Sequence, residues 1–93
     1  MTVAAGLRER LERALAPVRL DIVDESALHE GHAGSRPEGE THFRVTVVSA
    51  AFLGRSRVER QRLVHRAAAD LLASRIHALS IRALTPEEAA TAA

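Results

Sequence analysis

The sequence predicts an α+β domain in the order helix, strand, strand, helix, strand, followed by a short terminal helix. In two long segments apolar residues recur at helical spacing, and in three short segments they alternate with polar residues. A chain of 93 residues is expected to hold one small core, so residues 1–93 are predicted to form a single domain. We expect a three-stranded mixed sheet with its helices packed on one face.

The first helix is predicted from an apolar stripe near the N-terminus. Its members are Val3, Leu7, Leu11, Ala14 and Leu15. Charged residues cover the other side, and Pro17 ends the helix. Apolar and polar residues then alternate over positions 18–22, which is typical of a half-buried strand.

A long polar segment, residues 25–40, separates this strand from the next. Its glycines and proline break both periodicities, and such long loops in small domains are often functional. Alternation returns at residues 43–47, so we expect a second strand antiparallel to the first. His42 alternates with the core-facing Phe43 and is therefore expected on the solvent face.

The longest apolar stripe predicts one helix from Arg57 to Ile76. The third strand is expected over residues 77–83, with His77 at its start and on the same face as Leu79 and Ile81. Residues 85–88, Thr-Pro-Glu-Glu, then form a helix-start signature, with a capping Thr, a Pro in the first position and acids in the first turn.

Topology predicts that two distant groups of histidines meet. A strand–helix–strand connection usually returns parallel and right-handed, so the N-terminal ends of the second and third strands lie together. The loop with His29 and His32 arrives at that end, where His77 is expected to face it. Because the chain has no cysteine, any soft-metal chemistry that it performs alone must use histidine.

Composition limits the function classes. The 13 basic residues, all arginine, are nearly balanced by 12 acids, so bulk charge does not argue for nucleic acid. No apolar run approaches the roughly 18 residues of a membrane span, and the N-terminus does not resemble a secretory signal. We therefore expect a cytoplasmic protein. A Ser–His–Asp hydrolase is not expected, because Ser26 lacks a nucleophile-elbow context.

Several stretches of this chain, in this order, resemble the BolA family. They are Asp24-Glu25-Ser26, residues 40–45 (Glu-Thr-His-Phe-Arg-Val), Val48-Ser49 with Phe52-Leu53-Gly54, residues 60–64 (Arg-Gln-Arg-Leu-Val) and residues 76–81 (Ile-His-Ala-Leu-Ser-Ile). The resemblance spans residues 5–90 and implies an α-β-β-α-β sandwich like the class II KH fold. One departure is Gln61, where the family often has a histidine.

The resemblance implies a non-enzymatic accessory protein of the histidine-type subgroup, which partners a monothiol glutaredoxin. The two proteins would share a bridging [2Fe–2S] cluster, with the glutaredoxin cysteine and a glutathione thiol on one iron. His77 and His32 would serve the other iron, with His29 as the substitute for His32. The isolated chain is then expected to hold no cluster, and its role would lie in cluster trafficking, assembly or iron-status signalling.

Other interpretations of the same residues stay open. His77 could be a structural histidine satisfied by one hydrogen bond, and His32 a solvated loop residue. His29, His32 and His77 are also a conceivable zinc set. The sequence leaves open a weak homodimer, and it does not say whether clusters would be delivered, stored or sensed.

A basic segment supports an alternative function from another class. Five arginines crowd the start of the long helix: Arg55, Arg57, Arg60, Arg62 and Arg66. They would form either a solvated face or a surface for phosphate or an acidic protein. The alternative is a DNA-binding transcriptional regulator, although residues 54–57, Gly-Arg-Ser-Arg, lack the second glycine of the KH loop.

Overall fold

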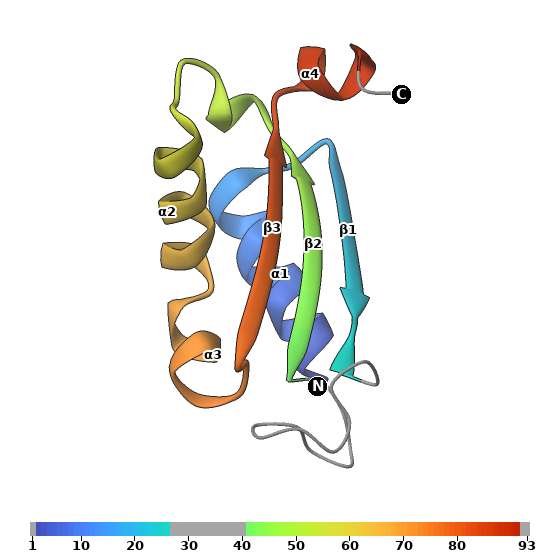
Figure 1. The fold of residues 1–93 in the computed structure, drawn as a ribbon, viewed down its shortest axis with the longest axis vertical. Helices are drawn as coiled ribbons and strands as arrows, with labels where there is room; N and C mark the ends of the chain where they lie inside the picture. Colours follow the sequence, from blue (N-terminus) through green and yellow to red (C-terminus); the bar gives the residue numbers. More distant parts are fainter. Residues whose placement is uncertain (1, 27–40, 92–93) are drawn as a thin grey trace.

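The computed structural model describes residues 2–26 and 41–91, which form a three-stranded sheet covered by helices on one face (Figure 1). The elements are α1 (Val3–Leu15), β1 (Arg19–Asp24), β2 (His42–Val48), a 3-10 turn (Ala50–Phe52), α2 (Arg57–Ala67), α3 (Ala69–Ser74), β3 (Ala78–Leu84) and α4 (Pro86–Thr91). The predicted order is confirmed, but the long helix is divided and the last strand begins one residue later than expected. Within these ranges no helix is long and apolar enough to cross a membrane.

The sheet is mixed, and β2 is its central strand. β1 pairs with β2 antiparallel, whereas β3 pairs with β2 in parallel, as predicted. The parallel register places His42 opposite Ala78, so the N-terminal ends of β2 and β3 lie together. Figure 1 shows these two ends at the same edge of the sheet, next to the end of β1.

The core lies between the sheet and helices α1 and α2. Alternate residues of β2 point into it, and Phe43, Val45 and Val47 are at most 2% exposed. Leu7 and Leu11 of α1 are fully buried against them, as the apolar stripe predicts. The other residues of β2 face the opposite side of the sheet, where Arg44 is exposed.

The predicted single helix of residues 57–76 is divided at Ala68, so that expectation was wrong in this detail. Ala68 has φ −104° and ψ 15°, outside the helical range, although its N–H still donates to the Val64 carbonyl at 3.1 Å. Ala68 is fully buried, and beyond it both Leu71 and Leu72 pack against the core.

Side chains of α2 cover the outer edge of β3. Gln61 Nε2 donates to the Ile81 carbonyl at 3.2 Å, and Arg60 Nη1 donates to the Ala83 carbonyl at 3.2 Å. Occupied carbonyls make an edge strand a poorer template for pairing with another chain. Gln61, the departure from the family pattern, therefore has a structural role at this edge.

Candidate functional site

His77 lies immediately before β3, where the chain bends after α3. Its backbone N–H donates to the Thr41 carbonyl at 2.7 Å, and the N–H of Ala78 reaches the same oxygen at 3.3 Å. The His77 side chain is exposed. The backbone of this histidine is thus fixed to the start of β2, while its imidazole stays accessible to a ligand or a partner.

The imidazole of His77 faces that of His42. The two ring planes differ by 17°, and their centroids are 6.0 Å apart. His42 is half-buried, and its Nδ1 lies 2.8 Å from Thr41 Oγ1. This contact holds the His42 ring against the start of β2.

The expectation that His77 shares a face with Leu79 and Ile81 was wrong. The alternation of a strand does not extend back to His77, because β3 starts at Ala78 and two successive amides converge on one carbonyl. The His77 ring meets His42, a residue of the sheet face opposite the core.

His42 is the residue that the sequence argument missed. The alternation of residues 43–47 predicts that His42 lies on the solvent face, and the sequence pattern assigns His42 no metal. The parallel register of β2 and β3 sets position 42 opposite position 78, so the same topology that located His77 could have found its neighbour.

Two buried polar residues, Ser26 and Thr41, form the Ser26 node, which connects the end of β1 with the starts of β2 and β3. Ser26 and Thr41 are 5% and 1% exposed. Ser26 Oγ accepts hydrogen bonds from the Thr41 N–H at 2.9 Å and the His42 N–H at 3.2 Å. The Ser26 N–H in turn donates to Asp24 Oδ1 at 2.9 Å. Ser26 therefore has a structural environment and no sign of a nucleophile's activation.

The loop ligands His29 and His32 lie outside the described residues, so their approach to His77 stays a prediction. Within residues 2–26 and 41–91 no group of three or more histidine and carboxylate side chains is placed to hold a metal. The described part contributes His77, with His42 beside it. An accessible imidazole fits iron, but further donors must come from elsewhere, which suits a shared [2Fe–2S] cluster.

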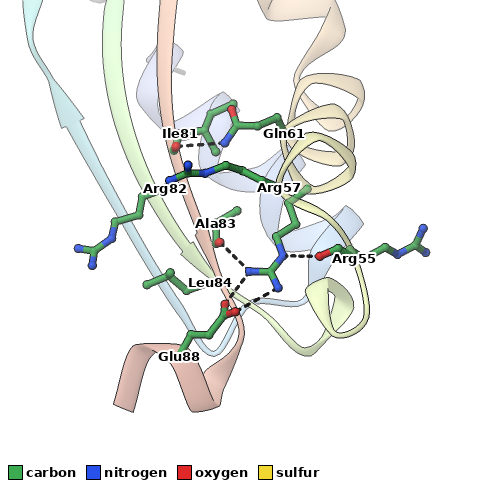
Figure 2. A pocket seen from close by; sticks show the side chains of 9 residues that line it. Arg55, Arg57, Gln61, Ile81, Arg82, Ala83, Leu84 and Glu88 are labelled. Carbon is green, nitrogen blue, oxygen red and sulfur yellow. Dashed lines mark hydrogen bonds and ion pairs between the residues drawn. The ribbon is translucent and has the colours of Figure 1, made fainter. Parts of the chain in front are cut away.

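Three of the five predicted arginines line a separate pocket of about 560 Å³, the arginine pocket, at the C-terminal half of β3 (Figure 2). Its lining includes Arg55, Arg57, Arg60, Arg82 and Glu88. In Figure 2 the Arg57 side chain extends from α2 toward β3, whereas those of Arg55 and Arg82 point outward.

Arg60 has a structural role, because it forms an ion pair with Glu88. Its Nη1 lies 2.6 Å from Glu88 Oε1, and its side chain is only 14% exposed. The hydrogen bond from Arg60 and, next, that from the Thr85 N–H lower the pKa of Glu88 to about 2. Arg55, Arg57 and Arg82 are therefore the more available cations of this pocket, and the exposed Arg62 and Arg66 lie elsewhere on α2.

Comparison with known proteins supports one family over most of the chain. Residues 11–88 match the family model described as BolA-like protein. BolA-like protein 1 of Mus musculus is 49% identical over 86 residues, which are 92% of this chain and 60% of that protein. SufE-like protein 1, chloroplastic/mitochondrial, of Arabidopsis thaliana is also 49% identical over 86 residues, but these are only 23% of its length. The chain thus spans less than two thirds of these two relatives.

A bacterial relative and a solved structure agree with this match. The DNA-binding transcriptional regulator BolA of Escherichia coli is 36% identical over 88 residues, which cover 95% of this chain and 80% of that protein. The structure of BolA1 from Arabidopsis thaliana superposes with a TM-score of 0.83 at 40% identity, covering 95% of this chain and 96% of that one. The α+β sandwich, the mixed sheet and the sequence match lead to one conclusion: this chain belongs to the BolA-like protein family.

Proposed function

We propose that this chain is a non-enzymatic accessory protein that binds a monothiol glutaredoxin and shares a bridging [2Fe–2S] cluster with it. The observation that carries the proposal is His77, whose backbone is anchored to Thr41 while its imidazole remains exposed. Family membership supports it, and the SufE-like name of one relative points to iron–sulfur metabolism. The role would be cluster trafficking, assembly or iron-status signalling in the cytoplasm.

The proposal gives the histidines of this chain distinct tasks. His77 binds one iron through an imidazole nitrogen, and His32 supplies the second nitrogen, with His29 as its substitute. The glutaredoxin cysteine and a glutathione thiol serve the other iron, and the bound cluster provides one-electron redox chemistry. Histidine ligands raise the reduction potential of such a cluster relative to all-thiolate ligation.

Co-expression with a monothiol glutaredoxin tests the proposal. The two proteins are purified together without oxygen, and the absorption spectrum is compared with that of each protein alone. We expect a visible chromophore in the complex that the isolated chain lacks. His65→Ala is the matched control for later histidine variants, because His65 is exposed on α2 and is not a member of the His42–His77 pair. A colourless complex, or an unchanged chromophore when His77 is replaced, would contradict the proposal.

A DNA-binding regulator is the second candidate, and the arginine pocket favours it. Arg55, Arg57 and Arg82 line a cavity whose one acidic side chain, Glu88, is already paired with Arg60. Guanidinium groups suit phosphate, and the Escherichia coli relative is named as a DNA-binding regulator. A DNA affinity of the cluster-free protein that falls steeply with salt would favour this candidate.

A further inference from the structure

One peptide unit at the start of β2 is held from both sides. The Thr41 carbonyl and the His42 N–H belong to the same planar peptide, and in a trans peptide they point in opposite directions. The carbonyl accepts the His77 N–H at 2.7 Å, and the His42 N–H donates to Ser26 Oγ at 3.2 Å. Ser26 and His77 therefore hydrogen-bond to opposite sides of the planar Thr41–His42 peptide.

Ser26 makes a second hydrogen bond to the start of β2. Its Oγ also accepts the Thr41 N–H at 2.9 Å, so one hydroxyl serves two successive amides. Both Ser26 and Thr41 are almost fully buried, so water cannot readily replace the hydroxyl. The Thr41–His42 peptide also carries the His42 ring, which faces the ring of His77.

We propose that Ser26 is a positioning residue for the His77 imidazole and acts through the Thr41–His42 peptide. When the hydroxyl is lost, the buried Thr41 N–H and the partly buried His42 N–H lose their acceptor, and the peptide can turn toward another partner. Because the carbonyl turns with the amide, the anchor of His77 weakens. The significance for cluster binding rests on the function proposed above, whereas the positioning of His77 in the free chain does not.

Ser49 supplies a matched control at the other end of β2. It is 1% exposed, its Oγ donates to the Leu15 carbonyl at 2.6 Å, and it accepts the Ala51 N–H at 3.0 Å. Ser49→Ala thus removes a buried hydroxyl with two partners but leaves the His77 end untouched. Ser26→Thr retains the hydroxyl and is the conservative rescue variant.

The test uses the free chain and measures amide hydrogen exchange and ring contacts by NMR. In Ser26→Ala we expect the His77 amide to exchange at least ~10-fold faster relative to the core amides of β2, since local opening is measured apart from global stability. The nuclear Overhauser contacts between the His42 and His77 rings should weaken as well. Ser49→Ala should leave both signals as in the wild type, and Ser26→Thr should restore them.

Two results would overturn the inference. One is an equal effect of Ser26→Ala and Ser49→Ala on the His77 amide, which would show general loosening only. The other is an unchanged His77 amide in Ser26→Ala. If Ser26→Ala does not fold, Ser26→Cys replaces it in the same free-chain experiment and is judged by the same two criteria. Cysteine has the same branching as serine, is somewhat larger and is a weaker acceptor.

The glutaredoxin co-complex then separates this inference from the proposed function. With both correct, Ser26→Ala shifts the nitrogen hyperfine couplings of the reduced cluster, and Ser49→Ala does not. If the wild-type complex holds no cluster while the free-chain signals change as expected, the proposed function fails and the positioning role of Ser26 stands.

Discussion

The imidazole rings of His42 and His77 lie nearly parallel with their centroids 6.0 Å apart, although the residues are distant in the sequence. The pairing follows from the parallel register of β2 and β3 and from the two amides that anchor His77 to Thr41. A change at one ring is therefore expected to reach the other.

Replacement of His42 should perturb the cluster site without abolishing it. We expect His42→Ala to fold, with a loss of about 1 kcal/mol in unfolding free energy if its main contact is one hydrogen bond. The glutaredoxin complex should still acquire a cluster, with altered nitrogen hyperfine couplings because the His77 ring has lost its neighbour. Pulsed electron paramagnetic resonance measures this. Cluster loss as complete as that caused by removing His77 would show instead that His42 is itself a ligand.

Replacement of Ala16 by glycine should increase the free energy of unfolding. It ends α1 in the left-handed region, with φ 44° and ψ 55°, and its N–H donates to the Glu12 carbonyl at 3.1 Å. This conformation costs an L-residue about 1–2 kcal/mol, and glycine's extra unfolded-state freedom offsets about half of the gain, so Ala16→Gly should add roughly 0.5–1 kcal/mol. Urea unfolding checks this.

Ala14→Gly is the control for that change. Ala14 is exposed inside α1, where glycine should lower the unfolding free energy by about 1 kcal/mol. Opposite signs for the two substitutions are the expected result. If both destabilise the protein, the left-handed strain at Ala16 is not a significant cost.

Acid should weaken the contact between α2 and α4. Arg60 holds the pKa of Glu88 at about 2 in the folded chain, below its ordinary value of 4.5. The ionised carboxylate therefore contributes stability that is fully present above pH 4.5 and is lost as the pH falls from there toward 2. Thermal unfolding of the wild type and Glu88→Gln should differ at pH 6, and the difference should shrink steadily below pH 4.5.

Glu87→Gln controls for the loss of an acid in the same turn. Glu87 is exposed at the start of α4, next to Glu88 in the chain. Its replacement should leave the acid dependence close to that of the wild type. Parallel pH curves for the wild type and Glu88→Gln would contradict a stabilising role for the ion pair.

The arginine pocket can be tested apart from the histidines. If it binds the phosphates of DNA, the double variant Arg57→Ala with Arg82→Ala should weaken binding and reduce the slope of log affinity against log salt by about 2. Arg60 is avoided because its guanidinium holds Glu88. Arg13→Ala, an exposed arginine of α1, should leave the slope unchanged. An unaltered slope in the double variant would exclude these two contacts.

Periodicity and topology were enough to predict most of the fold. Alternation in residues 43–47 identified the central strand, and the long helical stripe implied the parallel return of β3. The division at Ala68 could not be predicted, because the apolar stripe continues through it and local hydrogen bonds persist. Ala68 is fully buried where the helix divides, and such burial is a property of tertiary packing.

The site was predicted in part. Sequence placed His77 at the N-terminal end of β3, but a period of two could not reveal that the chain bends there and turns the ring toward His42. The Ser26 node was also missed, since a serine after a strand carries no pattern of its own. Its importance comes from contacts with Thr41 and His42, which depend on the way that β1 and β2 pair.

The glutaredoxin complex of His77→Ala tests the central claim most directly. The side chain is exposed and the anchoring bond belongs to the backbone, so this variant should fold with a loss of about 1 kcal/mol or less. Protein association can persist, because the protein contacts and the cluster bonds are separate contributions.

The decisive measurement is pulsed electron paramagnetic resonance of the reduced co-complex, with His65→Ala as the control. We predict that the His77→Ala complex loses the strong nitrogen hyperfine coupling and the absorption of a mixed thiolate–imidazole cluster, while the His65→Ala complex keeps both. A His77→Ala complex that retains the full nitrogen signature would show that His77 does not bind iron, and the proposed function would be wrong at its centre.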